Sequence, residues 1–498
     1  MNPDWRKLLS GAGIRGSESD LTDEFAARFG FACAQWLAEK LETTPDKLTF
    51  SVGRDNRPTL KRLSAAVIRG LTAADCDILD CGMCAAPALF NTLSWEGRRA
   101  NGAMMIVGSH AGAGVGEIRL SSSLGLPSAE DLSEILAAAQ GLHLPQRLVT
   151  PVDPMRAYTE GLNRMAHEKL EDDALRPLLG LHVIVDASGG AGGFYAGFLE
   201  ELGAETWGSY GFHGGQAPEK QPGETPLALL TRRVQEEEAD LGVLLDTDCD
   251  RATLVDHAGK VLSGNRLIAL IAAILLDEDP GATIVTDSVT SSGLSRFISE
   301  WGGVHYRFRR GSRNVIEEAK RLNDEGIDCP LAIETSGHTA FRDNKFLDDG
   351  LYMATWLICE AYDLKRCGKT LSGLIDDLAE PVESTEIRLR IQDEEPLPVA
   401  RSVIETVLSH TLDNPAWRLA TDSREGVRIL FNLEDGVENA FFQLRMSVHE
   451  KATMVLNAES DVPGGVQKIL SELYALLSDA PKIDLAPLKK VIDCAYLC

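Results

Sequence analysis

The stretch Leu241-Gly242-Val243-Leu244-Leu245-Asp246-Thr247-Asp248-Cys249-Asp250-Arg251 decides how the rest of the chain is interpreted. Its apolar first half predicts a buried strand, and three carboxylates at alternate positions follow directly. The strand brings the loop to the edge of a sheet, where Asp246, Asp248 and Asp250 offer hard oxygen donors. Such donors suit Mg²⁺, which keeps open positions for water or phosphate oxygens. The sequence therefore predicts a magnesium loop, with Arg251 as a fixed positive charge beside it.

Two other interpretations compete with a magnesium loop. A calcium-binding EF-hand also begins with alternating aspartates, but it requires Gly at its sixth position and Glu at its twelfth. Arg251 and His257 stand at those positions, so an EF-hand is excluded. A solvated acidic turn after a strand remains as the alternative, and segments elsewhere in the chain must decide between the two.

Length and charge limit the classes of protein to consider. At 498 residues the chain is too long for one core, and about 150 residues per domain predicts roughly three or four domains. The formal net charge of -26 argues against nucleic-acid binding, because a phosphate backbone requires clustered Lys and Arg. A small anionic substrate is compatible with this charge where local basic residues oppose the overall field.

No membrane-spanning segment is expected. The longest apolar run, 267–276, has about half of the ~20 residues needed to cross a bilayer, so we expect a buried helix there. The first residues lack the apolar core of a secretory signal, so we expect a cytoplasmic protein with reduced cysteines.

Predicted helices and strands alternate along most of the chain, which is typical of α/β domains. After Pro381 the pattern changes to several strands closed by a helix at 466–477. We expect three consecutive α/β domains with mixed, largely parallel sheets and a smaller C-terminal α+β domain. Their expected bounds are 1–150, 151–262, 263–382 and 383–498.

Two more segments follow predicted strands. Ser109-His110 comes directly after 102–108, at the sheet edge where α/β proteins carry active residues, but no acid partner for a hydrolase triad is spaced around it. The glycine-rich run 188–193 follows another strand, yet it lacks the spacing and the acidic partner of a dinucleotide fingerprint. Its glycines therefore predict a tight turn.

Five motifs occur in an order that is similar to one family. They are Gly13-Ile14-Arg15-Gly16, Val52-Gly53-Arg54-Asp55 with Arg57, the Ser109 loop, the aspartate loop and Glu334-Thr335-Ser336-Gly337-His338. Their order and rough spacing resemble the α-D-phosphohexomutase superfamily, which includes phosphoglucomutase and phosphomannomutase. The resemblance covers nearly the whole chain and implies a phosphohexomutase-like fold.

The resemblance also implies a reaction and the residues that perform it. The activity would be an isomerase that interconverts hexose 1-phosphate and hexose 6-phosphate through a phosphoserine and a hexose 1,6-bisphosphate intermediate. Such phosphoryl transfer depends on positioning and on charge neutralisation. The implied catalytic residues are Ser109, His110, Arg15 and Arg251, and the implied Mg²⁺ ligands are Ser109, Asp246, Asp248 and Asp250.

Substrate recognition is implied at three further places. Glu334, Ser336 and His338 would contact sugar hydroxyls, and Arg309 or Arg313 resembles the basic residue that the family places before this loop. In the segment 444–451, Arg445 and Ser447 match the family's grip for the phosphate that does not react, and His449 stands at a threonine position. This tail pattern resembles a divergent bacterial and plant branch of the superfamily.

The loop after Ser109 departs from the family pattern. Residues 111–117 replace the usual Asn-Pro and the later Asn-Gly, and Arg119 stands where the family usually has Lys. Two functions follow: a Mg²⁺-dependent mutase acting on glucose 1-phosphate and mannose 1-phosphate, or a catalytically weak or inactive homologue that serves as a sugar-phosphate sensor or scaffold. Retention of Ser109, the three aspartates and Arg251 favours the mutase. We expect a small sugar phosphate as partner and a monomer or homodimer.

Overall fold

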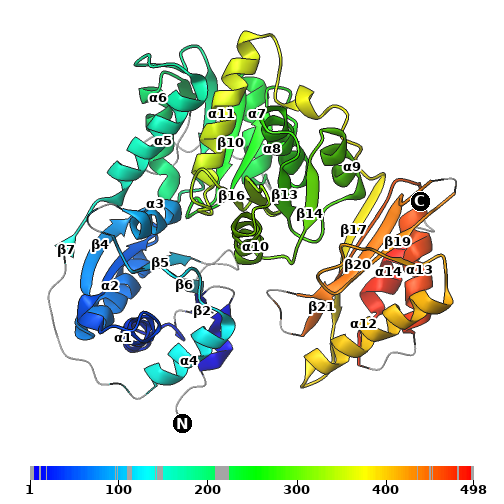
Figure 1. Cartoon of the computed structure of the whole chain (residues 1–498), viewed down its shortest axis with the longest axis horizontal. Coiled ribbons are helices and arrows are strands. Elements are labelled where there is room, and N and C mark those ends of the chain that lie inside the picture. The colour runs from blue at the N-terminus through cyan, green and yellow to red at the C-terminus, as the bar shows by residue number, and fades with distance from the viewer. Residues whose placement is uncertain are drawn as a thin grey trace. The chain divides into compact units, whose positions relative to one another are not determined.

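The computed structural model describes all residues except 1–4, 11–12, 18, 96, 98, 109–114, 141, 143–149, 208–223, 435, 448–449, 451, 479–481 and 495–498. The contacts divide the chain into two compact units, which Figure 1 draws together. Unit 1 comprises Met1–Leu262, Gly337–Ala340 and Leu347–Ser372, and unit 2 comprises Ser263–Ser336, Phe341–Phe346 and Gly373–Cys498. The two predicted N-terminal domains therefore fall in unit 1, and the third predicted domain is shared between the units.

The first sheet of unit 1 has seven strands in the order β1-β2-β6-β5-β3-β4-β7. They are β1 (Leu9–Ser10), β2 (Gly13–Ser17), β3 (Thr49–Arg54), β4 (Asp77–Met83), β5 (Gly102–Gly108), β6 (Val115–Ser122) and β7 (Thr150–Pro151). β3 is parallel to β4 and β5, whereas β6 is antiparallel to β5 and β2. The sheet is therefore mixed, as expected from the sequence.

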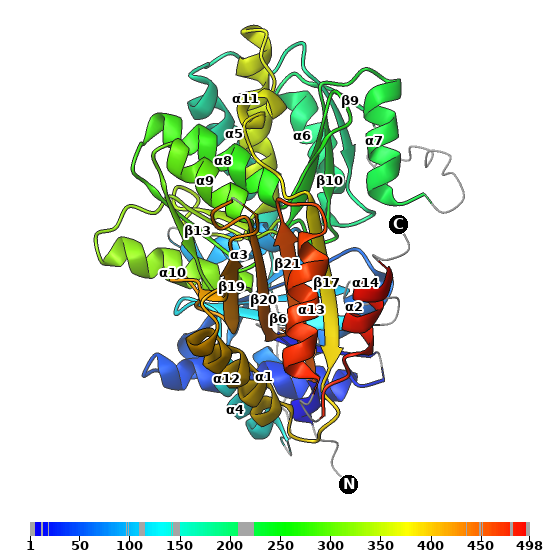
Figure 2. The same ribbon diagram turned by 90° about the vertical axis from the view of Figure 1, so that its right-hand side faces the viewer.

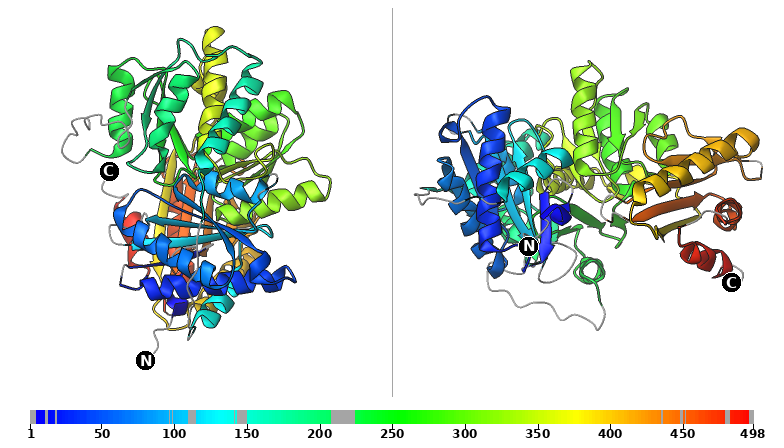
Figure 3. Two further views of the ribbon diagram at one scale, coloured as in Figure 1. Left: turned by 90° about the vertical axis from the view of Figure 1, so that its left-hand side faces the viewer. Right: turned by 90° about the horizontal axis from the view of Figure 1, so that it is seen from below.

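Helices cover both faces of this sheet. The helices are α1 (Asp23–Lys40), α2 (Pro58–Ala73), α3 (Ala86–Asn91) and α4 (Ala129–Ala139). Met104 and Ile106 of β5 pack into the core formed with α1, α2 and α4, while Ala103 and Met105 pack with α3 on the other face. Figure 3 shows α1 and α2 in dark blue along this sheet. β5 is buried along its whole length because it has a helix layer on each side.

The second sheet of unit 1 has the order β12-β11-β10-β8-β9. Its strands are β8 (His182–Asp186), β9 (Glu205–Trp207), β10 (Leu241–Leu245), β11 (Ala252–Asp256) and β12 (Val261–Leu262). The helices of this part are α5 (Pro154–Leu170), α6 (Tyr195–Glu201), α7 (Pro226–Glu236) and α11 (Gly350–Arg366). β10 lies at the centre, parallel to β8 and antiparallel to β11, so its carboxyl end is a strand end inside the sheet.

α11 belongs to unit 1 although it follows the third predicted domain in sequence. Two buried hydrogen bonds fix it there: Tyr158 Oη donates to Asp349 at 2.6 Å, and Tyr195 Oη lies 2.9 Å from Thr355 Oγ1.

The third sheet contains three parallel strands of unit 2, in the order β14-β13-β15. The strands are β13 (Thr283–Thr286), β14 (Val304–Arg307) and β15 (Leu331–Ile333), and the short β16 (Thr339–Phe341) follows them in the chain. The helices are α8 (Asn265–Glu278), α9 (Ser292–Glu300) and α10 (Ser312–Asp324). The apolar run 267–276 lies on α8 and is almost entirely buried, as predicted. Within the described part of the chain, no helix is both long and apolar enough to cross a bilayer.

The fourth sheet, also in unit 2, is antiparallel with the order β17-β21-β20-β19-β18. Its strands are β17 (Glu383–Arg390), β18 (Arg418–Leu419), β19 (Val427–Phe431), β20 (Ala440–Met446) and β21 (Thr453–Ser460). The helices α12 (Pro396–Asp413), α13 (Gly465–Leu477) and α14 (Ala486–Cys494) lie on one face of this sheet (Figures 1 and 2).

The two faces of the fourth sheet differ in chemistry. Apolar residues such as Ile429 and Phe442 pack against the helices, as alternation along a strand requires. The opposite face carries Arg428, Gln443 and Arg445, which are only 2%, 1% and 3% exposed. Buried charged side chains require partners, and Arg428 finds them in the loop that follows β13, where it donates to the carbonyl oxygens of Ser288 and Thr290 at 3.1 Å.

Candidate active site

The aspartate loop is fixed by hydrogen bonds to two neighbouring segments of unit 1. Ala86 at the start of α3 donates its backbone N–H to the carbonyl oxygen of Asp248 at 2.9 Å, and Ala191 donates to Thr247 at 2.8 Å. A Cβ at Gly190 would lie 2.4 Å from the Cα of Thr247. Since Cβ atoms do not approach other atoms so closely, this position requires glycine. The run 188–193 therefore forms a close support for the aspartate loop.

The three carboxylates of the loop converge, as the alternating spacing predicted. One oxygen from each of Asp246, Asp248 and Asp250 lies within 4.8 Å of the others. Nη1 of Arg119 lies 2.7 Å from Asp248 Oδ2 and 2.5 Å from Asp250 Oδ2, and Nη2 of Arg251 lies 2.8 Å from Asp246 Oδ2. Two guanidinium groups therefore face three carboxylates and neutralise them only in part.

Burial and charge move the pKa values of these carboxyls in opposite directions. Burial, together with Asp250 and Asp248, raises the pKa of Asp246 well above its ordinary value. Burial also raises the pKa of Asp248 to about 6, although Arg119 opposes this. Burial acts on Asp250 as well, but Arg119, His338 and Arg251 outweigh it and hold the pKa of Asp250 below its usual range. The cluster has more negative charge than its surroundings can easily accommodate.

The donor set fits a magnesium ion. Oδ1 of Asp248 and Oδ1 of Asp250 are buried and accept no hydrogen bond from any described residue. Orphaned buried oxygens are costly unless a cation or a donor satisfies them. Because the donors are carboxylate oxygens, a hard divalent cation such as Mg²⁺ satisfies them best.

Arg15 joins the aspartate cluster through a chain of charges. β2 and β6 pair so that Arg15 lies opposite Glu117. Nη2 of Arg15 is 2.8 Å from Oε2 of Glu117, and Nε of Arg119 is 3.5 Å from Oε1 of the same carboxylate. Glu117 thereby orients both arginines, a role that the sequence analysis missed.

His338 lies beside the aspartate loop in unit 1. Its Nδ1 is 2.8 Å from Oδ2 of Asp348 and 4.0 Å from Oδ2 of Asp250. Although burial lowers it, the pKa of His338 is raised to about 10 by Asp348 and Asp250, so the ring is cationic at neutral pH. The sequence suggested a contact to a sugar hydroxyl, whereas the described contacts of the ring are to these two carboxylates.

The first half of the predicted sugar loop lies in unit 2. Glu334 is 3% exposed and accepts hydrogen bonds from the backbone N–H of Gly311 at 2.5 Å and from Ser336 Oγ at 3.1 Å. The next residue, Thr335, donates its hydroxyl to Oδ2 of Asp287 at 2.7 Å. Asp287, at the end of β13, therefore positions the loop that carries Glu334 and Ser336.

Arg310 is a basic residue that lies beside this loop. Nε of Arg310 lies 3.9 Å from Oδ2 of Asp287. Arg309, which the sequence favoured together with Arg313, places its guanidinium 5.6 Å from the centre of the Phe308 ring. The sequence analysis named Arg309 and Arg313 for this position and did not consider Arg310.

Arg445 and Ser447 lie at the end of β20. Arg445 has a buried Nε without a hydrogen-bond partner, 3.8 Å from Oε2 of Glu425. Ser447 Oγ accepts a hydrogen bond from the backbone N–H of Glu450 at 3.1 Å. Three predicted site residues, Ser109, His110 and His449, lie outside the described residues.

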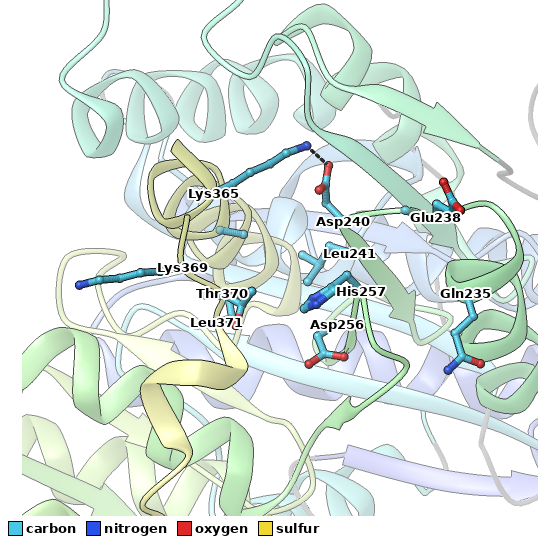
Figure 4. A pocket seen from close by; sticks show the side chains of 12 residues that line it. Gln235, Glu238, Asp240, Leu241, Asp256, His257, Lys365, Lys369, Thr370 and Leu371 are labelled. Carbon is cyan, nitrogen blue, oxygen red and sulfur yellow. Dashed lines mark hydrogen bonds and ion pairs between the residues drawn. The ribbon is translucent and has the colours of Figure 1, made fainter. Parts of the chain in front are cut away.

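A separate hollow of about 450 Å³ in unit 1 is not part of this cluster. It lies around Asp240 and Leu241, at the opposite end of β10 from the aspartate loop. Figure 4 shows Lys365 reaching toward Asp240 across this hollow, with a separation of 2.6 Å between Nζ and Oδ2. Because the hollow lies at the other end of β10, we assign it no part in chemistry at Asp246, Asp248 and Asp250.

Comparison with protein families gives matches over most of the chain. Residues 6–142, 156–259 and 263–382 match the phosphoglucomutase/phosphomannomutase α/β/α domains I, II and III, respectively.

Curated relatives and solved structures agree with these family matches. A phosphoglucosamine mutase of Beijerinckia indica is 30% identical over 74% of this chain and 80% of its own length, and a phosphoglucomutase of Neisseria gonorrhoeae is 25% identical over 96% and 98%. A phosphoglucomutase/phosphomannomutase family protein of Burkholderia thailandensis has a similar structure, with a TM-score of 0.74 at 23% identity, covering 96% of this chain and 99% of that one. An Aspergillus fumigatus N-acetylphosphoglucosamine mutase, solved with GlcNAc-6P and magnesium, has a TM-score of 0.57 at 13% identity, covering 94% and 95%.

The fold and the relatives define the class first: an isomerase that transfers phosphate within one molecule, built from three α/β/α domains and a smaller fourth domain. The chain belongs to the α-D-phosphohexomutase superfamily and acts on hexose phosphates as a mutase.

Proposed function

We propose that this chain is a Mg²⁺-dependent phosphohexomutase in which Ser109 carries the phosphoryl group and a hexose 1,6-bisphosphate is the intermediate. The observation that supports it most is the aspartate cluster, where Asp248 and Asp250 each keep one buried oxygen without a hydrogen-bond donor. A solvated acidic turn, the alternative interpretation of this loop, would not bury these oxygens. Similarity to a mutase solved with magnesium supports the same choice of metal.

The proposal gives each charged residue of unit 1 a task. Asp246, Asp248 and Asp250 would hold Mg²⁺, which supplies charge neutralisation to phosphate oxygens. Arg15 and Arg251 present fixed positive charges that stabilise the additional charge of a transferring phosphoryl group. His338, cationic through Asp348, positions Asp250 rather than moving a proton.

Recognition of the sugar is assigned to unit 2. Glu334 and Ser336 already share a hydrogen bond, and both side chains suit the O3 and O4 hydroxyls, which have one configuration in glucose and mannose. No residue of the loop is assigned to C2, where glucose, mannose and glucosamine differ. Relatives named phosphoglucosamine mutase support tolerance at this carbon. We therefore propose activity on glucose, mannose and glucosamine phosphates.

The test combines turnover with detection of the phosphoserine. Purified protein is incubated with Mg²⁺ and glucose 1,6-bisphosphate, and peptide mapping by mass spectrometry is expected to show phosphate on Ser109. Coupled assays with the 1-phosphates of glucose, mannose and glucosamine then measure the mutase. An unmodified Ser109 after this incubation would refute the proposed carrier, and sugar-phosphate binding without turnover would favour the sensor or scaffold role.

A substitution in the loop tests the metal site separately. Asp248→Asn is expected to lower turnover by about 10²–10³-fold while the thermal midpoint stays close to wild type, because an isosteric amide keeps the loop packed but binds Mg²⁺ poorly. Asp173→Asn, which changes an exposed carboxylate of unit 1, is the control and is expected to be neutral. Unfolding of Asp248→Asn alone would mean that the carboxylate is structural.

A further inference from the structure

The side chain of Glu425 sits among donors in unit 2 that are suited to a phosphate group. Its Oε2 accepts a hydrogen bond from Ser288 Oγ at 2.5 Å and from the backbone N–H of Arg310 at 3.2 Å. Nε of Arg445 lies 3.8 Å from the same oxygen. One carboxylate oxygen therefore faces a hydroxyl, a backbone amide and a guanidinium, the three kinds of donor that bind phosphate.

Glu425 does not satisfy this cradle fully. The Nε of Arg445 is buried and has no hydrogen-bond partner among the described residues, since 3.8 Å is too long for a hydrogen bond. Arg445 is only 3% exposed, so water compensates little. A buried guanidinium nitrogen that lacks an acceptor points to a ligand with more oxygens than one carboxylate provides.

The backbone around Glu425 is held independently of its side chain. Gly426 has a φ of +59°, and a Cβ there would lie 2.1 Å from the carbonyl oxygen of Leu444, so the loop is pressed against β20. Asp422 forms an ion pair with Arg307 at 2.5 Å, and Arg424 donates to the carbonyl oxygen of Arg307 at 3.0 Å. Moving Glu425 out of the cradle therefore requires only a rotation of its side chain.

Charge favours replacement of the carboxylate. Once Glu425 leaves, the guanidinium groups of Arg445 and Arg310 face one buried carboxylate, that of Asp287, which lies 3.9 Å from Nε of Arg310. A phosphate monoester carries more negative charge than a carboxylate near neutral pH and offers three terminal oxygens. It can therefore contact Ser288, the Arg310 amide and Arg445 together.

We propose that Glu425, held by Ser288 and the backbone amide of Arg310, occupies the phosphate grip at Arg445 as an internal competitor until the non-reacting phosphate of the substrate displaces it. The inference rests on the proposed function for the identity of the ligand. It adds Ser288, Arg310 and Glu425 to the phosphate grip that sequence resemblance placed at Arg445 and Ser447. Glu425 would thereby make binding selective for a dianionic phosphate over weaker anions.

The experiment measures phosphate binding with and without the competitor. Isothermal titration calorimetry on the full chain uses inorganic phosphate and glucose 6-phosphate as probes, with wild type, Glu425→Gln and Glu425→Ala. Both variants are expected to bind each probe about five- to ten-fold more tightly, since a charged competing hydrogen bond has been removed. Glu405→Gln on α12, which removes an equal charge at an exposed position, is the matched control and is expected to leave both affinities unchanged.

Two further measurements keep the outcome decisive. Arg445→Met is expected to abolish the gain in affinity when combined with Glu425→Gln, because the subsite then lacks its guanidinium. In steady-state assays Glu425→Gln is expected to lower KM while kcat does not fall.

Unchanged or weaker phosphate binding by both Glu425 variants would overturn the inference and make Glu425 a structural or sugar-contacting residue. Circular dichroism and thermal melting check that each variant is folded. If one of the two Glu425 variants does not fold, the other one carries the test. The proposed function and the subsite can fail separately. If wild type shows no mutase turnover while Glu425→Gln binds phosphate more tightly than wild type, the proposed function is refuted and the subsite stands.

Discussion

Replacing Arg119 by methionine tests whether the aspartate loop depends on a standing positive charge. Arg119 reaches Asp248 and Asp250 through the same nitrogen, at 2.7 and 2.5 Å, and its side chain is 18% exposed. Methionine keeps much of the apolar stem but leaves both carboxylates without this partner. Arg251 then remains as the principal guanidinium facing the cluster, with Nε 3.5 Å from Oδ1 of Asp250.

The expected loss of stability is large. Breaking a buried ion pair by removing one partner costs about 3–5 kcal/mol, because the remaining charge stays buried. At about 2–4 °C per kcal/mol for a unit of this size, the thermal midpoint of Arg119→Met is expected to fall by roughly 10 °C without metal. Arg62→Met is the control, because its ion pair with Asp23 is exposed and contributes at most about 1 kcal/mol.

Mg²⁺ is expected to compensate for the missing charge. Under the proposed function the metal binds only the folded state, so Mg²⁺ is expected to raise stability by about 2.7 kcal/mol at a hundred times its Kd. Loss of Arg119 removes a cation that repels Mg²⁺, so the metal-dependent rise of the midpoint should be larger in Arg119→Met than in wild type. Differential scanning calorimetry with and without MgCl₂ measures both quantities.

Two results would contradict this reasoning. A metal-free midpoint equal to that of wild type would show that the ion pairs contribute nothing to stability. The second result is that Mg²⁺ stabilises wild type but not Arg119→Met. It would show that Arg119 holds the aspartates in place rather than balancing their charge.

Two other predictions concern stability. Burial, with Arg307 and Arg428 nearby, lowers the pKa of His305 well below its ordinary value, so the unfolded chain binds a proton near pH 6.5 that the folded chain does not. The free energy of unfolding is therefore expected to fall as pH drops below about 6.5. Chemical denaturation should show a smaller fall in His305→Gln than in wild type, whereas the exposed control His257→Gln should fall as wild type does. Gly190→Ala is expected to displace the aspartate loop, lower the thermal midpoint through overpacking worth about 1–3 kcal/mol and remove the effect of Mg²⁺ on the midpoint. Gly161→Ala on α5, where a Cβ meets only an arginine nitrogen at 3.8 Å, should do neither, and a Gly190→Ala protein with a normal response to Mg²⁺ would contradict the proposed support.

The sequence by itself predicted many of the elements and the convergence of carboxylates in the aspartate loop. The helix predicted at 466–477 is observed at Gly465–Leu477, and the aspartates follow a buried strand as expected, because apolar periodicity and adjacent carboxylates are local features. The order of five motifs was sufficient to indicate the family that the comparisons then showed. The strands β1, β2 and β6 were not predicted, since strand pairing defines them more than their own composition does. The helices α4 and α12 were also missed, although α4 begins with a local capping box at Ser128 and Asp131.

The tertiary structure alone decided which charges meet. Arg119 and Asp248 are 129 residues apart in sequence, and no local spacing connects them. Arg310 gave no signal in the sequence before the fold placed it beside Asp287, and Glu425 gave none before β19 and β20 brought it next to Arg445. Periodicity predicts which face of a strand is buried, but the partner across that face is fixed only when distant segments pack together. For that reason the aspartates proposed as metal ligands and the adjacent Arg251 were readable from the sequence, whereas the distant counter-charge Arg119 was not.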